Sequence, residues 1–337
     1  MTNLSAGFAR QNHFRAVYVE QDAFSYEMTQ RILSRLEGCP VITIRRYQDV
    51  FFRPNQDVRW QKEYPALILA VKRKKLVYPG PPICQHFGHQ RFYSCNLMIG
   101  CPFDCSYCYL QGLYPSAFPV AFVNINDFAH ALVDLASEPV YVALSHDSDL
   151  LAFNGLIPYL DLLFEQIDPK WPIIAEVRTK TANRHYFLHH EPISNVIFAF
   201  SLAPDEVISR YERRTPSLDA RLEAIKTAQD RGFAVRLCFD PIIAEPELEA
   251  AYDAFFQKVF QKVDRTKVVD LSYGFFRMSD TLYRRIARLR PYCALYQNNG
   301  FSDDEIKTGS PDIRQVFLSR HLKMLYERVG PDRVFLS

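Results

Sequence analysis

Residues 100–112 read GCPFDCSYCYLQG, and this stretch places Cys101, Cys105 and Cys108 in the spacing C-x3-C-x2-C. Three thiolates on so short a loop can bind one face of an iron–sulfur cube. A [4Fe–4S] cluster normally has four cysteine ligands, so three would leave one iron free to bind a small molecule. We therefore expect this loop to carry a [4Fe–4S] cluster with one open iron.

The open iron suits the α-amino and carboxylate groups of S-adenosylmethionine (SAM). An electron from the cluster could then cleave the SAM sulfonium to a 5′-deoxyadenosyl radical. Other interpretations of the cysteines remain open. Zinc usually takes four ligands, often from paired C-x2-C units, and no second pair is present. Cys95 could be a fourth ligand that closes the cluster for electron transfer, and the spacing could also be a coincidence in a buried core.

The composition is that of a folded protein with a large core. The chain has 337 residues, of which 48% are hydrophobic and 23% charged, and its net charge is +2, which neither favours nor excludes a nucleic-acid partner. No run approaches ~20 apolar residues, so we expect no membrane-spanning helix, and residues 1–15 lack the apolar core of a signal peptide. We expect a cytoplasmic protein whose eight cysteines are ligands, catalytic thiols or core residues rather than disulfides.

From Phe92 onward, strand-like and helix-like segments alternate. Short β-branched or aromatic runs predict strands at residues 140–144, 173–177, 196–200, 234–239 and 268–273. Apolar residues at helical spacing predict helices at residues 127–136, 156–167, 218–231 and 247–263. With the cysteine segment as the first strand and loop, about six βα units result, and such units form a parallel sheet. We predict an α/β fold with a partial (β/α)6 barrel and C-terminal extension over residues 91–337, and the cysteine loop at its catalytic mouth.

The helix predicted at residues 218–231 has clear boundary signals. Thr215 is expected to cap it, Pro216 suits its first turn and Gly232 should end it. Its buried face is predicted to contain Leu218, Leu222 and Ile225.

Residues 1–90 have a different pattern of strand-like and helix-like segments, which predicts a small α/β domain. Residues 15–21 and 40–47 are expected to form strands, and residues 26–36 a helix between them. The segment ALILAVKRKKLVYPGPP, residues 66–82, reads as an apolar strand, a basic turn and a Pro/Gly-rich linker.

The segment CSYCYLQ resembles the cluster loop of the radical SAM superfamily, and CYLQ in particular is similar to spore photoproduct lyase. The likeness extends through VYVEQDAFSYEM, LAVKRKKL and YERRTPSLDARLEAI, covers nearly the whole chain and fades after about Tyr292. It implies a radical SAM lyase with a partial (β/α)6 barrel and a small N-terminal domain. Such an enzyme reverses a thymine–thymine crosslink in DNA, as DNA repair, by abstracting hydrogen from the lesion.

The resemblance also implies which residues contact SAM. Each of these polar residues also ends an apolar run, which places it at the barrel rim where ligands bind. The expected SAM contacts are Ser148, Asp149, Lys180 and Ser201. The resemblance further implies that Tyr107 and Tyr109, which flank Cys108, contact SAM or take part in returning the radical.

One catalytic position departs from the family. Where spore photoproduct lyase has the cysteine that returns a hydrogen atom to the product radical, this chain has His146. Imidazole is a poor hydrogen-atom donor compared with a thiol, so we expect the donor to have moved or the reaction to differ. Alternation along the strand places Cys238 on the same face as Arg236 and Asp240, which makes Cys238 a candidate donor, although a free cysteine is more often an inert core residue.

Basic residues gather in the N-terminal part of the chain and could bind nucleic acid. The residues are Arg45, Arg46, Arg53, Arg59, Lys62 and Lys72, Arg73, Lys74, Lys75. The basic hairpin with which the family holds damaged DNA is poorly matched by residues 296–317, whose middle is acidic. We therefore keep three hypotheses: a radical SAM enzyme acting on damaged DNA and reduced by an external flavodoxin or ferredoxin, radical modification of a peptide or small metabolite, and a non-catalytic iron–sulfur protein that binds DNA.

Overall fold

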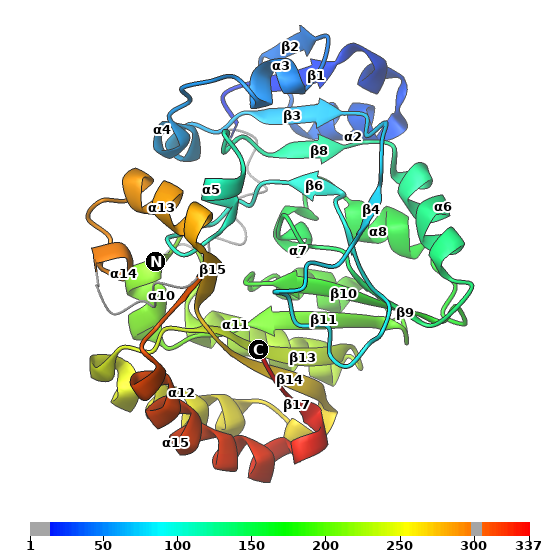
Figure 1. Ribbon diagram of the computed structural model, residues 1–337. Helices are drawn as coiled ribbons and strands as arrows, with labels where there is room; N and C mark the ends of the chain where they lie inside the picture. The colour runs from blue at the N-terminus through cyan, green and yellow to red at the C-terminus, as the bar shows by residue number, and fades with distance from the viewer. Residues whose placement is uncertain (1–13, 298–304) are drawn as a thin grey trace.

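The computed structural model describes residues 14–297 and 305–337 and shows an α/β protein with two main sheets (Figure 1). In the view of Figure 1 the smaller sheet lies at the top and the larger one below it. Within these described residues, no helix has the length and apolar character needed to cross a membrane.

The larger sheet has eight strands in the order β17-β14-β13-β11-β10-β9-β5-β4. All neighbouring pairs are parallel except β4 with β5. The edge strands β4 and β17 are not paired with each other, so the predicted partial barrel is confirmed. The strands are β4 (Val77–Pro79), β5 (Phe92–Cys95), β9 (Val140–Ala143), β10 (Ile173–Thr179), β11 (Val196–Ser201), β13 (Ala234–Ile242), β14 (Val268–Phe275) and β17 (Val334–Leu336).

Helices follow most of these strands and bury their apolar faces. Figure 1 shows the long helices α12 and α15 below the larger sheet, whereas α11 lies at the level of β11 and β13. Phe239 on β13 packs edge-on against Phe256 of α12, with 5.0 Å between ring centroids, as expected for an apolar outer strand face. The helices of the barrel half are α6 (Ile125–Leu135), α7 (Leu150–Phe153), α8 (Tyr159–Phe164), α9 (Arg184–His189), α10 (Asp205–Tyr211), α11 (Leu218–Asp230), α12 (Glu249–Lys262), α13 (Asp280–Leu289), α14 (Ala294–Gln297) and α15 (Pro311–Val329).

Helix α11 differs from the sequence-based prediction at its start, where Pro216 precedes the cap instead of lying in the first turn. Its predicted apolar face is buried and Gly232 follows its end with a positive φ of 84°. The cap, however, is Ser217, whose hydroxyl accepts from the backbone N–H of Ala220. Thr215 instead donates to the carbonyl of Glu212 at 2.8 Å, because the chain turns beneath the cysteine loop before the helix begins.

The inner face of the barrel strands is polar. Arg236 is 1% exposed, pairs with Glu176 at 2.7 Å and with Asp270, and donates to the hydroxyl of Tyr141 at 2.8 Å. Side chains alternate along a strand, so Cys238, two residues along β13, faces the same interior.

The smaller sheet combines strands from both sides of residue 90. Its order is β2-β1-β3-β8-β6, and β6 and β8 lie after residue 90, whereas β4, which lies before it, belongs to the larger sheet. The sheets therefore do not divide at residue 90, and separate folding of residues 1–90 and 91–337 stays a prediction. The elements are β1 (Val17–Glu20), α2 (Glu27–Arg35), β2 (Val41–Ile44), α3 (Gln48–Phe51), α4 (Val58–Glu63), β3 (Leu67–Ala70), β6 (Met98–Ile99) and β8 (Val120–Phe122).

Two small strand pairs complete the part of the chain that the structure describes. β7 (Asp104–Cys105), in the cysteine loop, pairs with β12 (Glu212–Arg213), which follows α10, and β15 (Arg277–Ser279) pairs with β16 (Ile306–Thr308) between β14 and β17 of the chain. Of residues 296–317, where the family hairpin was expected to be poorly matched, residues 298–304 lie outside the described residues.

Candidate active site at the barrel mouth

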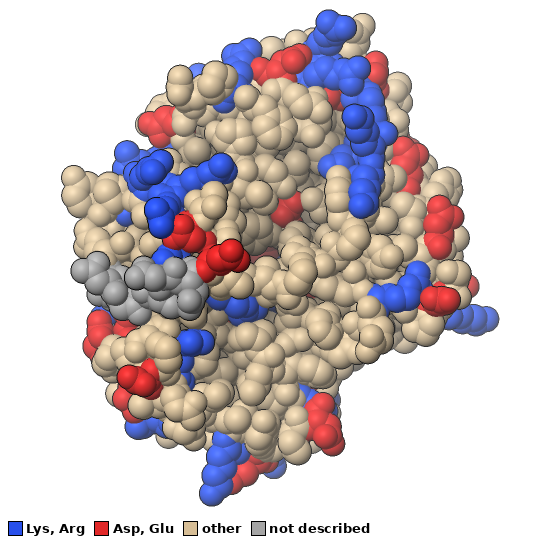
Figure 2. Space-filling model, viewed as in Figure 1, with Lys and Arg blue, Asp and Glu red and all other residues tan. Residues whose placement is uncertain are grey.

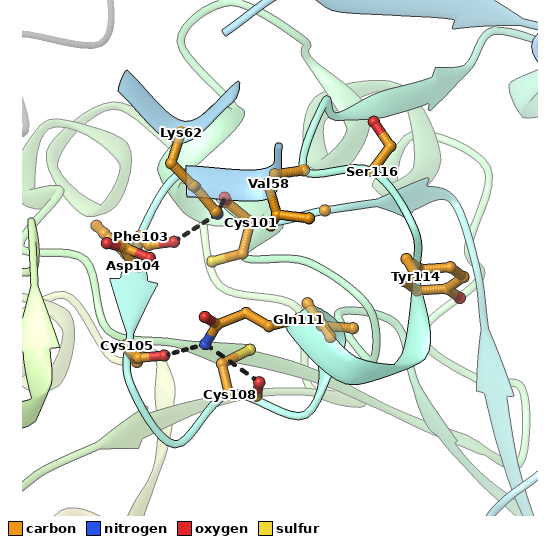
Figure 3. A pocket seen from close by; sticks show the side chains of 13 residues that line it. Val58, Lys62, Cys101, Phe103, Asp104, Cys105, Cys108, Gln111, Tyr114 and Ser116 are labelled. Atoms are coloured by element: carbon orange, nitrogen blue, oxygen red, sulfur yellow. Dashed lines mark hydrogen bonds between the residues drawn. The ribbon is translucent and has the colours of Figure 1, made fainter. Parts of the chain in front are cut away.

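The three cysteines lie around one cavity between the two sheets. Cys101, Cys105 and Cys108 all line it, and Figure 3 shows the side chains of Cys101 and Cys108 pointing into the same space. The ammonium of Lys62, on α4, donates to the carbonyls of Cys101 and Phe103, each at 2.7 Å. Helix α4, in the N-terminal part of the chain, thus holds the cysteine loop in place.

The chemistry of this cavity fits an iron–sulfur cluster better than a single metal ion. In the described residues, no three His, Cys, Asp or Glu side chains converge closely enough to hold one ion. Burial raises the pKa of the Cys101 thiol to about 12 and also raises the pKa values of Cys105 and Cys108. The thiols therefore need a positive group to become thiolates, and a cube that spreads several irons among them would supply it.

A buried ion pair supports the cysteine loop from below. Arg221 and Glu212 are 0% and 2% exposed and form a salt bridge, while β12 pairs Glu212 with Cys105. The hydroxyl of Tyr107 also donates to Glu212, and Arg221 donates to the Ser201 carbonyl at 3.0 Å. Burial alone would raise the pKa of Glu212, but Arg221 beside it lowers that pKa overall. The sequence analysis did not single out this pair.

The residues expected to contact SAM meet at the same rim but differ in their freedom to bind. The carboxylate of Asp149 caps α7, accepting from the N–H of Ala152 at 3.0 Å, and also accepts from the Thr179 hydroxyl and from the N–H of Lys180 at 2.7 Å. These contacts occupy both of its oxygens and indicate a structural part. The ammonium of Lys180 lies 5.6 Å from the ring centroid of Tyr107, and the buried hydroxyl of Ser148 has no hydrogen-bond partner among the described residues.

A second cavity of about 150 Å³ opens at the barrel mouth. Its walls include Tyr109 and His146 together with the charged side chains of Arg178, Asp240 and Arg277. Burial lowers the pKa of His146, although Asp147 next to it acts in the opposite direction. Both guanidinium groups are paired within the wall, Arg178 with Glu176 at 3.1 Å and Arg277 with Asp240 at 3.3 Å.

Asp147 organises this mouth, although the sequence analysis did not select it as a site residue. Its carboxylate is 2% exposed and accepts from the hydroxyls of Tyr114 at 2.7 Å and Tyr109 at 3.1 Å, and from the amide of Asn96. These donors come from two separate segments, because Tyr109 and Tyr114 flank the short helix α5 (Leu110–Leu113) and Asn96 follows β5. The only sequence signal for Asp147 is that it is a carboxylate shortly after a predicted strand.

The other two cysteines considered in the sequence analysis line neither cavity. Cys95 is fully buried and does not line the cavity of the three cysteines. Cys238 lies on the interior strand face, as expected, but it is also fully buried and does not line the mouth cavity. The geometry thus gives Cys238 no direct path to a substrate, and its role as hydrogen donor stays a prediction.

The basic N-terminal residues are only partly available to a partner. Lys62 is used within the cysteine loop, and Arg73 pairs with Glu20 at 2.9 Å and Asp22 at 2.7 Å. Figure 2 shows Lys and Arg side chains gathered along the upper right of this face, over the turn after β3, and a second group over α13. The exposed arginines of α13 are Arg284, Arg285 and Arg288.

An incomplete parallel barrel with a three-cysteine loop at its mouth defines the radical SAM class of enzymes. The family model described as spore photoproduct lyase matches residues 13–300, and the chain belongs to this family. It is 24% identical over 268 residues to the spore photoproduct lyase of Geobacillus sp. (strain Y412MC61), covering 77% of this chain and 76% of that protein. The corresponding enzyme of Bacillus subtilis (strain 168) is 23% identical over 262 residues, covering 74% of each chain.

Solved structures of spore photoproduct lyase share the fold. One, described as complexed with dinucleoside spore photoproduct, superimposes with a TM-score of 0.79 at 20% identity over 97% of this chain and 99% of that one. Another, a mutant with bound AdoMet and dinucleoside spore photoproduct, gives a TM-score of 0.78 at 20% identity over 96% and 98%. The predicted family and fold are therefore confirmed.

Proposed function

We propose that the chain is a radical SAM lyase that acts on a thymine–thymine lesion in DNA, with a [4Fe–4S] cluster on Cys101, Cys105 and Cys108. The observation that carries this proposal is the arrangement of two cavities joined by one segment. The three thiols line the first cavity, and Tyr109, directly after Cys108, lines the second.

Polar residues at the ends of the barrel strands suit SAM. Lys180 offers an ammonium for the SAM carboxylate, and the unpartnered hydroxyl of Ser148 offers a further hydrogen bond. When bound, the cluster and SAM together supply a 5′-deoxyadenosyl radical that abstracts hydrogen. Tyr107, held by Glu212, and Ser201, at the end of β11, complete the rim.

The mouth cavity, of about 150 Å³, suits the base portion of an extruded thymine lesion, with the sugars and phosphate of the dinucleotide at its opening. Arg178 and Arg277 line the cavity, and although each already pairs with a carboxylate of the wall, a guanidinium has five N–H donors and can also donate to the phosphate that joins two nucleotides. A lesion must leave the base stack to enter such a cavity, and a damaged step unstacks more easily than an intact one. The two basic groups of Figure 2 lie on either side of this face and could bind the flanking backbone.

Electrons for the cluster are proposed to come from an acidic external protein of the flavodoxin or ferredoxin type. Arg213 beside the cysteine loop is 57% exposed on its side chain and could contact such a donor. Electrostatic complementarity of this kind mainly raises the association rate and makes it sensitive to salt.

The test is anaerobic reconstitution of the full chain with iron, sulfide, SAM and a low-potential reductant. Formation of 5′-deoxyadenosine together with conversion of a dinucleoside spore photoproduct to two thymidines supports the proposal. The matched control is Cys105→Ala, which should yield neither product. Formation of 5′-deoxyadenosine without conversion of the dinucleotide or of irradiated DNA would refute the assigned substrate and favour a peptide or small metabolite.

A further inference from the structure

The thiol of Cys84 lines the mouth cavity, together with Tyr109 and His146. Cys84 lies in the segment between β4 and β5, which the sequence analysis treated as a linker. Ser145 also lines this cavity; the residue is 7% exposed, and its buried Oγ has no hydrogen-bond partner in the described residues. A buried polar group without a partner is costly, so a polar atom of a ligand that reached this hydroxyl would be bound favourably.

The segment that bears Cys84 is anchored to the barrel rather than free. Phe87 is 5% exposed, and its ring lies against the guanidinium of Arg236, 3.3 Å from the ring centroid. Arg277 donates to the Ile83 carbonyl at 3.2 Å, and Gln85 donates to the Leu336 carbonyl at 2.9 Å. These contacts fix the backbone on both sides of Cys84 and hold its thiol at the cavity wall.

Cys84 therefore has the access that Cys238 lacks. Charged interior groups, among them Arg178 and Glu176, lie near the sulfur of Cys238, which has no exposed surface. Arg178 and Glu176 also line the mouth cavity, so Cys238 lies behind the wall that Cys84 helps to form.

We propose that Cys84 is the hydrogen-atom donor of this enzyme, replacing the thiol that the family has at the position of His146. This inference rests on the proposed function and names one further catalytic residue for it. The S–H bond of Cys84 breaks, a C–H bond forms on the product radical, and the unpaired electron passes to the Cys84 sulfur. One proton and one electron, from the low-potential donor that also reduces the cluster, then restore the thiol.

The electrostatics of the cavity keep Cys84 in the form that can donate hydrogen. Burial raises the pKa of the Cys84 thiol, although Arg178 and Arg277 act in the opposite direction. The raised pKa keeps this group as S–H at neutral pH. Only the S–H form can donate a hydrogen atom, since a thiolate has none to give.

The test compares variants in heavy water with dinucleoside spore photoproduct as the substrate. The thiol exchanges its hydrogen with solvent, so the natural chain should place one solvent-derived deuterium in the repaired thymine. Cys84→Ala should lower that incorporation at least tenfold and yield by-products of the unquenched radical. Cys39→Ser is the matched control and should behave like the natural chain. Cys39 lies just before β2 of the smaller sheet and does not line the mouth cavity.

A second measurement needs no turnover. Iodoacetamide should alkylate Cys84 of the intact apoprotein much faster than Cys238, as read by peptide mass, and bound dinucleotide should protect Cys84. Normal deuterium incorporation by Cys84→Ala, or loss of incorporation only in Cys238→Ala, would overturn the assignment of Cys84 as the donor. Either result would leave the proposed function standing. Absence of repair by the natural chain would overturn the proposed function and this inference together.

Discussion

The hydroxyl of Tyr109 donates a hydrogen bond to the backbone carbonyl of His146 at 2.7 Å. Tyr109 directly follows the last cysteine of the loop, and His146 follows β9, so this contact ties the cysteine loop to the barrel mouth. Because the contact uses a backbone carbonyl, it does not depend on the side chain at residue 146. The mouth can therefore keep its shape when that side chain changes.

The first prediction concerns the cluster ligands. Replacing Cys105 by Ala should abolish the iron–sulfur absorbance near 400 nm after anaerobic reconstitution, because two thiolates cannot hold the cube on one face. Cys95→Ala is the matched control, since Cys95 is buried away from the cavity and should leave the absorbance in place. Loss of the absorbance in Cys95→Ala would identify Cys95 as a fourth ligand and contradict the open-iron site.

The second prediction concerns the buried ion pair under the cysteine loop. Arg221→Met removes the cation and leaves Glu212 buried without compensation, which should cost about 3–5 kcal/mol in the free energy of unfolding. Arg31→Ala breaks the exposed pair with Glu27 and should cost about 0.5 kcal/mol or less.

Chemical denaturation of the apoprotein measures the free energy of unfolding of Arg221→Met and of Arg31→Ala. A double variant, Arg221→Met with Glu212→Gln, should recover part of the loss, because it no longer buries an unpaired charge. Equal stability of Arg221→Met and the natural chain would contradict the structural role of the pair.

The third prediction concerns acid sensitivity. Burial lowers the pKa of His321, although Asp253 acts in the opposite direction, and burial also lowers the pKa values of His89 and His146. As the pH falls below the ordinary histidine pKa of about 6.5, the unfolded chain binds protons that the folded chain does not. The free energy of unfolding should therefore fall with pH below about 6.5, by up to about 1.4 kcal/mol per pH unit for each such group.

His321→Gln tests one part of this acid sensitivity. The variant should lose less stability between pH 7.5 and pH 5.5 than the natural chain does. Phe317→Leu, a change in the same helix that does not titrate, should shift the stability equally at both values. An unchanged pH slope in His321→Gln would show that His321 does not contribute.

The fourth prediction concerns binding to DNA. Replacing Lys74 and Lys75 by Ala, or Arg284 and Arg288 by Ala, should weaken binding to a lesion-containing duplex. For each phosphate that the protein no longer neutralises, the slope of log K against log salt should become shallower by about 0.9. Lys323→Ala, an exposed change on α15, should leave the slope unchanged. If the slope changes only in the variant of Arg284 and Arg288, the basic turn with Lys74 and Lys75 does not contact the DNA.

Local patterns and long-range contacts explain what the sequence could and could not predict. The cysteine loop and the strands after Phe92 were predictable, because cysteine spacing and apolar runs are properties of short segments. Glu212 and Arg221, which support that loop, lie more than a hundred residues further on. Their contact with it is a tertiary contact, which the periodicity of a short segment cannot predict. Cys84 was missed for the same reason, since its segment becomes part of the mouth only when the barrel forms around it.

The last prediction concerns a thiol placed at residue 146, the position where the sequence resemblance implies one in the family. His146 and Cys84 line the same cavity, so a thiol at either position should reach a substrate radical there. In the Cys84→Ala background, His146→Cys should restore solvent deuterium in the repaired thymine to at least half of its natural level. His146→Ser in that background is the matched control and should restore nothing, because an aliphatic O–H is a far poorer hydrogen-atom donor than S–H. A double variant no better than Cys84→Ala would mean that a residue 146 side chain does not reach the substrate, and that the donor position in this enzyme depends on the segment between β4 and β5 alone.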